Sequence, residues 1–174
     1  MATIGVMYKN IKSFTKIAEF GRKLLSRPSL ELAIPMISTY AKELLEADRC
    51  SVFIYDKPKK RLWTVLADGV KEIEIAEDQG IAGAAFQVKK ALIVNDPYSD
   101  DRFSSKIDHE TGYMTKNIIA IPILNAFNEP IGVLQLLNKS SGDFDEDDRR
   151  LLTFFNHYIS GYVELANYFS EEKV

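Results

Sequence analysis

The spacing of apolar side chains in the first part of the chain predicts two helices. Residues 11–25 carry an apolar side chain at every third or fourth position, and residues 30–45 repeat this spacing after a break at 26–29. This is the period of an amphipathic helix, because it gathers the apolar side chains on one side. Pro35 lies in the early turns of the second helix, so we expect either a later start or a bend there.

Alternation replaces this period in the middle of the chain and predicts strands. From residue 49 to 56, Cys50, Val52 and Ile54 alternate with a second set of side chains, which is the period of a strand. The segments with strand character are 49–56, 62–67, 73–75, 91–94, 118–124 and 131–137. Polar turns separate most of them, so the sequence predicts an antiparallel sheet of about six strands.

A long amphipathic helix follows the last strand from about Asp145, so helices flank the sheet at both ends of the chain. We therefore predict an α+β fold whose N- and C-terminal helices pack together on one face of the sheet. These helices carry more aromatic residues than one sheet face needs, namely Phe14, Phe20, Phe154, Phe155, Tyr158, Tyr162 and Phe169. Either all of them pack internally, or a helical bundle between two copies buries the excess; we favour the homodimer.

Two segments are candidates for function. Residues 80–83, Gly-Ile-Ala-Gly, open a predicted short helix, and the backbone N–H groups of such a helix start can bind an anion. The same tetrapeptide also fits a close-packed helix start that binds nothing, and taken alone it favours this second interpretation. Residues 98–117 form a polar, irregular stretch of the kind in which compact domains tend to carry functional groups.

Composition and charge narrow the class of protein. The 174 residues fit one domain, and 46% hydrophobic with 27% charged residues is ordinary for a soluble globular chain. A net charge of −3 gives no reason to expect nucleic acid or an anionic membrane as a partner. The chain has no membrane-length apolar segment, no signal-peptide pattern and a single cysteine, Cys50, which together predict a cytoplasmic location.

The sequence offers no catalytic or metal-binding set of residues. His109 has no cysteine or second histidine near it, and His157 lies among the aromatic residues of the last helix. Cys50 lies in a predicted strand, where a buried structural thiol is the commoner role. The acidic run 143–148 lacks the ligand spacing and terminal Glu of a calcium loop. We therefore predict no enzyme activity, no metal and no obligatory cofactor.

The segment from Asn138-Lys139 to Phe144-Asp145-Glu146 resembles the N-K-x(n)-F-x3-D-E signature of GAF domains. GAF domains of this kind occur in cGMP-regulated phosphodiesterases and bacterial adenylate cyclases. The resemblance runs from about residue 29 to 162 and keeps the GAF order of elements. It implies a GAF fold, with a pocket and short helices on the sheet face opposite the terminal helices.

The signature also implies a structural latch. In the resembling domains, a salt bridge that would here join Lys139 to Asp145 holds a loop closed over the pocket without touching the ligand. This sequence departs from the signature at its Phe, because Ser141, with three residues between it and Asp145-Glu146, holds that position and Phe144 is adjacent instead.

The resemblance further implies a set of ligand-binding residues, namely Ser51, Asp68, Ile81, Ala82, Asp108, Thr111, Thr115 and Gln135. In the resembling domains, the position of Asp68 meets the purine edge, and those of Ile81 and Ala82 lie beside the cyclic phosphate. Turn and capping chemistry is the alternative role for Asp68, Thr111 and Thr115. Three positions depart from the family pattern, with Ala67 in place of a stacking Phe, Ser104 in place of a Tyr and Gln135 in place of a Glu.

We therefore predict a homodimeric sensory module that binds a small molecule, a cyclic nucleotide such as cAMP or cGMP or a related purine. It would signal through its terminal helices to an output domain in a longer parent chain. Residues 1–28 would form a dimerisation helix, 29–163 the ligand-binding domain and 164–174 the link to the output. A GAF domain without ligand that serves for dimerisation is the alternative. A free methionine sulfoxide reductase needs reactive pocket cysteines, for which Cys50 is the one candidate.

Overall fold

The computed structural model describes residues 2–27, 29–67 and 72–171. Its helices are α1 (Ala2–Leu24), α2 (Leu30–Leu45), α3 (Gly80–Val88), α4 (Lys106–Thr111) and α5 (Glu146–Glu171), with a 3-10 turn, η1 (Pro97–Ser99). Its strands are β1 (Ala47–Asp56), β2 (Arg61–Ala67), β3 (Ile73–Ala76), β4 (Leu92–Val94), β5 (Ile118–Leu124) and β6 (Pro130–Lys139). The predicted α+β fold with a six-stranded antiparallel sheet is confirmed.

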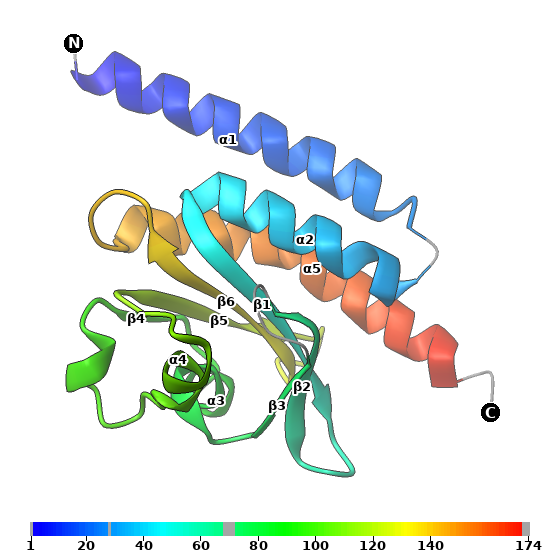
Figure 1. Ribbon diagram of the computed structural model, residues 1–174. Helices are drawn as coiled ribbons and strands as arrows, with labels where there is room; N and C mark the ends of the chain where they lie inside the picture. Colours follow the sequence, from blue (N-terminus) through cyan, green and yellow to red (C-terminus); the bar gives the residue numbers. More distant parts are fainter. Residues whose placement is uncertain (1, 28, 68–71, 172–174) are drawn as a thin grey trace.

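The sheet has the strand order β3-β2-β1-β6-β5-β4, and every neighbouring pair is antiparallel. The two longest strands, β1 and β6, therefore lie side by side in its centre (Figure 1). Their register pairs Ser51 with Gln135 and Phe53 with Val133. Strands that start far apart in the sequence thus form the middle of the sheet, where each is covered on both faces.

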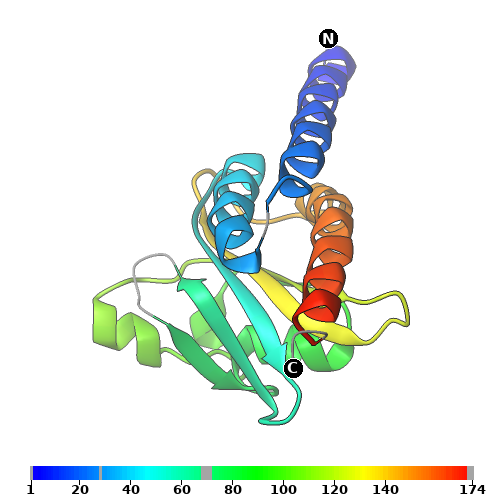
Figure 2. The same cartoon turned by 90° about the vertical axis from the view of Figure 1, so that its right-hand side faces the viewer.

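The terminal helices α1, α2 and α5 form two layers on one face of the sheet, and α3 and α4 lie on the other face. The inner layer is α2 and α5, and α1 lies outside it against both helices (Figure 1). The N-terminal part of α1 extends away from the rest of the domain (Figure 2). The C-terminal half of α1 is attached to the core by the buried side chains of Ile17, Phe20 and Leu24. The ring centroids of Phe20 and Phe155 of α5 are 4.4 Å apart. The first and last helices therefore pack together, as predicted from their apolar stripes.

Strand alternation divides the interior into two cores. On the helix side, Cys50, Val52 and Ile54 of β1 join the apolar faces of the helices. On the opposite side, Phe53 joins a smaller cluster that includes Phe86 of α3 and Ile118, Ala120 and Val133 of β5 and β6. The two faces of β1 and β6 therefore serve different purposes, because one binds the helices and the other faces α3 and α4.

Local structure departs from the sequence-based expectation at two places. Helix α2 begins at Leu30, directly after Ser29, so the later start that Pro35 suggested is wrong. Pro35 removes the N–H that would bond to the carbonyl of Glu31, and burial of Ile34 and Ile37 outweighs this loss. The second departure lies in residues 98–117, where part of the irregular stretch folds as α4. None of the helices within the described ranges is long and apolar enough to cross a membrane.

Candidate ligand-binding site

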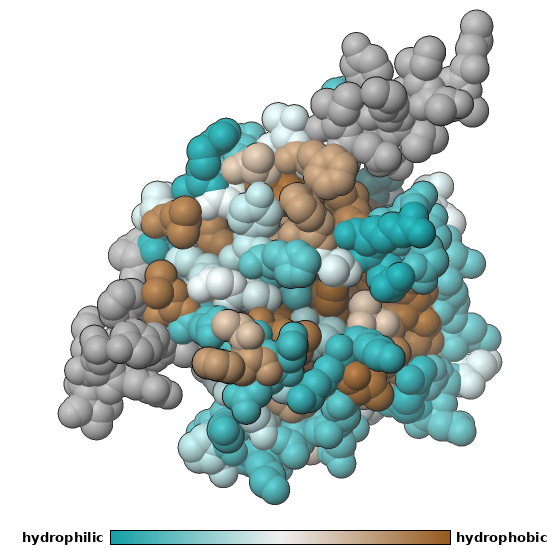
Figure 3. All heavy atoms as spheres, turned by 180° about the vertical axis from the view of Figure 1, so that it is seen from behind, coloured by the Kyte–Doolittle hydropathy of each residue, from teal (hydrophilic) through white to brown (hydrophobic). Residues whose placement is uncertain are grey.

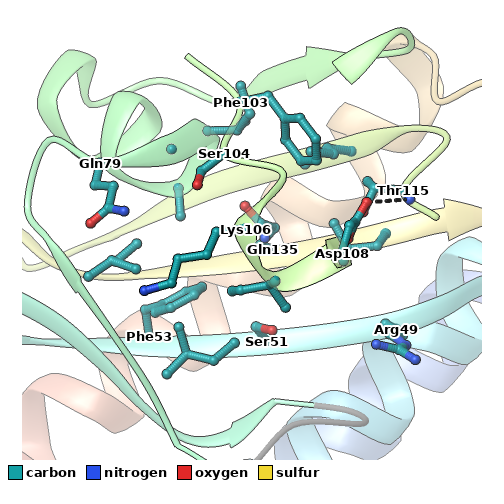
Figure 4. A pocket seen from close by; sticks show the side chains of 18 of the residues that line it. Arg49, Ser51, Phe53, Gln79, Phe103, Ser104, Lys106, Asp108, Thr115 and Gln135 are labelled. Carbon is teal, nitrogen blue, oxygen red and sulfur yellow. Dashed lines mark hydrogen bonds between the residues drawn. The ribbon is translucent and has the colours of Figure 1, made fainter. Parts of the chain in front are cut away.

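A cavity of about 320 Å³ lies on the sheet face that α3 and α4 cover. Its floor comes from the centre of the sheet, including Ser51 and Phe53 of β1 and Gln135 of β6 (Figure 4). The start of α3 forms one wall, α4 with the residues that flank it forms another, and β3 lines the remaining side. Small-molecule sites in proteins are commonly about 300 to 1,000 Å³, so the volume suits a compact ligand.

Two polar side chains lie next to each other on this floor. Ser51 and Gln135 are partners across β1 and β6, and both line the cavity. Ser51 is only 7% exposed and Gln135 is half-buried, yet neither side chain has a hydrogen-bond partner within the part of the chain that the structure describes. Neither side chain is among the buried polar atoms that lack a partner in the described residues, so their polar atoms are accessible from the cavity. The pair therefore presents a hydroxyl and a carboxamide that a polar ligand can satisfy.

The start of α3, which lines the cavity, carries backbone donors that the helix does not use. The first hydrogen bond of this turn runs from Gly83 N–H to Gln79 O at 3.0 Å, which leaves the N–H groups of Gly80, Ile81 and Ala82 without an acceptor inside the helix. These three residues line the cavity. Gly83 itself has a packing role, because a Cβ there would lie 2.5 Å from the backbone carbon of Asp78. The close-packed helix start and the available donors therefore coexist.

Asp108 lines the cavity, but its carboxylate is committed to the protein. It accepts hydrogen bonds from Thr115 N–H at 2.8 Å, Thr115 Oγ1 at 2.9 Å and the Tyr98 hydroxyl at 2.8 Å. The bond to Asp108 raises the pKa of Tyr98. Asp108 and Thr115 thus fasten the wall around α4, and a ligand would meet side chains that are already hydrogen-bonded to the protein.

One further predicted residue, Thr111, is not among the residues that line the cavity. Thr111 is exposed, and its hydroxyl donates to the carbonyl of Ile107 in its own helix at 2.8 Å. Thr111 is not among the cavity-lining residues, because the last turn of α4 directs it elsewhere. Asp68 lies outside the described residues. Ser51, Ile81, Ala82, Asp108, Thr115 and Gln135 do share one cavity.

Several cavity residues were missed by reasoning from the sequence, among them Arg49, Phe53, Phe103, Lys106 and Tyr113. Phe53 could have been found, because alternation along β1 places it on the same face as Ser51. Arg49 follows from the same alternation. Phe103, Lys106 and Tyr113 lie in the stretch around α4, where no period in the sequence indicates which side chains turn inward.

The predicted latch forms with a different carboxylate. Lys139 Nζ lies 2.5 Å from Asp148 Oδ2, and the two side chains are only 16% and 13% exposed. Asp145, the predicted partner, instead accepts the backbone N–H groups of Asp147 and Asp148 at 2.9 Å and caps the start of α5. The correction has a geometric reason: a capping carboxylate is held over the first turn, while the side chain one turn later can reach back to the strand end.

Phe144 is the aromatic residue of the signature in this structure. It is buried at 2% exposure, and its N–H and carbonyl both bond to the side chain of Asn95. Because Asp148 follows Phe144 after three residues, the F-x3-D spacing of the signature is present, with Arg149 in the place of its Glu. The predicted departure at Ser141 is therefore wrong, because the Asp of the signature is Asp148 and not Asp145.

Asn138 ties the end of β6 to the residues that follow α4. Its carboxamide accepts the N–H of Lys116 at 2.7 Å and donates to the carbonyl of Met114 at 2.8 Å. In the reverse direction along the same contact, the carboxamide of Asn117 accepts a hydrogen bond from the N–H of Lys139 at 2.8 Å. The two asparagines therefore join the latch to the cavity wall.

The described residues contain no group of three or more His, Cys, Asp or Glu side chains that could hold a metal ion. Cys50 is fully buried on the helix side of β1, away from the cavity floor.

The fold, the cavity and the latch together define the class of protein. The family model described as GAF domain matches residues 29–162, so the chain belongs to the GAF domain family. A solved GAF domain from an Acinetobacter phosphoenolpyruvate-protein phosphotransferase superposes with a TM-score of 0.79 over 92% of this chain and 98% of its own, at 16% identity.

Similar curated sequences come from cyclic-nucleotide phosphodiesterases. The chain is 31% identical over 144 residues to a probable 3',5'-cyclic phosphodiesterase, pde-5, of Caenorhabditis elegans. It is 32% identical over 145 residues to the dual 3',5'-cyclic-AMP and -GMP phosphodiesterase 11A of Takifugu rubripes. Each match covers 75% of this chain, but only 20% and 16% of the respective relative. The similarity therefore concerns one part of much longer proteins.

Proposed function

We propose that this GAF domain is a cytoplasmic regulatory module that binds a cyclic nucleotide or a related purine, with cAMP and cGMP as the first candidates. The observation that carries the proposal is the pair of Ser51 and Gln135 on the cavity floor, whose side chains have no hydrogen-bond partner among the described residues. The names of the relatives, which include a dual cAMP and cGMP phosphodiesterase, support this ligand class.

The chemistry of the cavity suits an anionic ligand with a planar base. The N–H groups at the start of α3 offer donors and the positive end of a helix dipole to a phosphate. Phe53, Ile81 and Ile118 provide apolar surface for the base. The hydroxyl of Ser51 and the carboxamide of Gln135 supply both donors and acceptors for polar edges of the ligand. Asp68, Thr111 and Thr115 remain candidates for ligand contact.

Calorimetric titration with cAMP and with cGMP tests the proposal. We expect saturable binding of at least one of them, and Gln135→Leu should weaken it roughly tenfold because the ligand's polar edge loses a partner. Thr39→Val is the matched control, because Thr39 lies on α2 on the opposite face of the sheet and its hydroxyl donates to Pro35 O in its own helix, so the variant's affinity should equal that of the unaltered protein. Absence of heat and of any melting shift with both nucleotides would contradict the proposal and favour a GAF domain that serves for dimerisation without a ligand.

We also propose that two copies associate through α1 and α5. Phe154, Tyr158, Gly161 and Leu165 follow each other at steps of four and three residues along α5, which is the spacing of a helix–helix seam. Phe14 of α1 meets Phe154 edge-on at 5.2 Å, yet both rings remain more than 40% exposed. Seen from behind, apolar side chains come to the surface over the helical layers (Figure 3). A second copy would cover this stripe.

Sedimentation equilibrium checks the dimer. Phe154→Glu should shift the protein to monomer at micromolar concentration, because the change places a charge in the centre of the apolar stripe. Phe127→Glu is the control, since Phe127 is 82% exposed at the tip of the β5–β6 hairpin and should leave the dimer intact. A protein that is monomeric before substitution, or a Phe154→Glu variant that stays dimeric, would remove this proposal.

We propose a regulatory role and no catalytic step for this chain. In this proposal, residues 1–28 form the dimerisation helix, 29–163 the ligand-binding domain and 164–174 the link to an output domain. A solved free methionine-R-sulfoxide reductase from Neisseria meningitidis shares the fold at 16% identity and a TM-score of 0.74. A reductase of that kind would need a thiol in the cavity, whereas Cys50 belongs to the helix-side core. An assay of methionine sulfoxide reduction that compares the unaltered protein with Cys50→Ala would test the reductase alternative.

A further inference from the structure

The cavity wall that follows α4 is fastened to β1 through one side chain, Tyr113. Its hydroxyl donates to Asp48 Oδ2 at 2.8 Å, although 65 positions separate the two residues. Its ring lies over the guanidinium of Arg49, with Cζ 3.5 Å from the ring centroid. We call these two contacts the Tyr113 clasp. Arg49 and Tyr113 both line the cavity, so the clasp is part of the cavity lining.

The other fastenings of this wall have different anchors. Asp108 bonds within the same stretch of chain, to Thr115 and Tyr98, and therefore makes the wall one stiff piece. Asn138 holds Met114 and Lys116 from the end of β6. Among the side-chain contacts described above, the Tyr113 clasp is the one that joins this stiff piece to β1.

The character of the clasp suits repeated opening and closing. Asp48 is exposed, so water can compete for the Tyr113 hydroxyl, whereas the carboxylate of Asp108 is buried and stays paired. Burial and the bond to Asp48 raise the pKa of Tyr113, and the hydroxyl therefore remains a donor at neutral pH. Local opening starts where contacts are few and reachable by solvent, which is the situation at this end of the cavity.

We infer that Tyr113 is a positioning residue that holds the cavity wall closed, and that release of the Tyr113 clasp limits how fast a ligand enters and leaves. The part about the ligand rests on the proposed function. Asp48 follows the end of α2 by only three residues, and Glu46 between them bonds through its carbonyl to Ser140 N–H beside the latch. The clasp therefore also attaches the cavity wall to the junction of helix layer and sheet.

Hydrogen exchange of the backbone amides of residues 106–116, measured on the ligand-free protein, tests the clasp directly. Tyr113→Leu loses both contacts and should exchange roughly tenfold faster or more, while Tyr113→Phe keeps the ring and loses the hydroxyl and should show a smaller rise. Asp48→Asn keeps an acceptor and should lie near the unaltered protein. Met114→Ala is the matched control, because Met114 is the next residue and its side chain is 66% exposed.

Stopped-flow binding of a fluorescent cGMP analogue supplies the second measurement. The association and dissociation rates should both rise in Tyr113→Leu, so that Kd changes less than either rate, which a merely destabilised fold would not produce. Exchange in Tyr113→Leu equal to that in Met114→Ala overturns the inference. If the unaltered protein binds no cyclic nucleotide, the proposed function fails, and the exchange measurement still decides whether the clasp holds the wall.

Discussion

Replacing Lys139 by alanine is expected to lower the free energy of unfolding by about 3 kcal/mol, because Asp148 is then left buried without its counter-charge. The two side chains are 16% and 13% exposed, so solvent screens the pair only weakly. Lys139 is not among the residues that line the cavity, yet ligand affinity should fall as well. The reason is that loss of the ion pair loosens the end of β6, where the neighbouring Asn138 holds Met114 and Lys116 beside the cavity wall.

Denaturant unfolding of a double-mutant cycle measures this effect. Asp148→Asn should destabilise about as much as Lys139→Ala, whereas Lys139→Met combined with Asp148→Leu should regain most of the loss, since no charge then remains buried. Asp145→Asn is the matched control, because asparagine caps a helix nearly as well as aspartate. An unchanged melting point and affinity in Lys139→Ala would sink the latch, and a larger loss at Asp145 than at Asp148 would reinstate the partner predicted from the sequence.

Replacing Gly83 by alanine should cost about 2 kcal/mol of stability and should also weaken ligand binding. A Cβ at this position would lie 2.5 Å from the carbonyl carbon and 3.0 Å from the Cα of Asp78, and backbone atoms cannot turn aside as a flexible side chain would. The first turn of α3 must therefore move, and with it the backbone of Ile81 and Ala82, which line the cavity.

Gly112→Ala provides the comparison for this second prediction. Gly112 ends α4 with φ +69 and has no atom within 4 Å of the added Cβ, so alanine there should cost only the strain of a left-handed residue, about 1 kcal/mol. Thermal melting and calorimetric titration of both variants check the pair. Equal affinities in Gly83→Ala and the unaltered protein would separate the start of α3 from the ligand site.

The period of the side chains was enough to predict the fold, because each strand and long helix has a buried face that repeats along the sequence. The same logic could reach Ser51, Phe53 and Gln135, which lie on regular strands. It could not choose between Asp145 and Asp148, since both lie in one acidic run and only the geometry of the first helical turn decides which one reaches Lys139. The contact of Tyr113 with Arg49 was equally out of reach, because neither residue belongs to a pattern that involves the other.

The central strands β1 and β6 have a thermodynamic consequence for how the domain must be measured. Ser51 faces the cavity while its direct neighbours Cys50 and Val52 touch the helix-side core, so ligand and helices contact opposite faces of the same short stretch of backbone. Energetic coupling between ligand binding and the arrangement of the helices is reciprocal. Association of the helices with a second copy alters ligand affinity by the same factor by which the ligand alters the affinity of that association. Affinity is then a property of the assembly in which the domain is placed, and the isolated chain supplies its reference state.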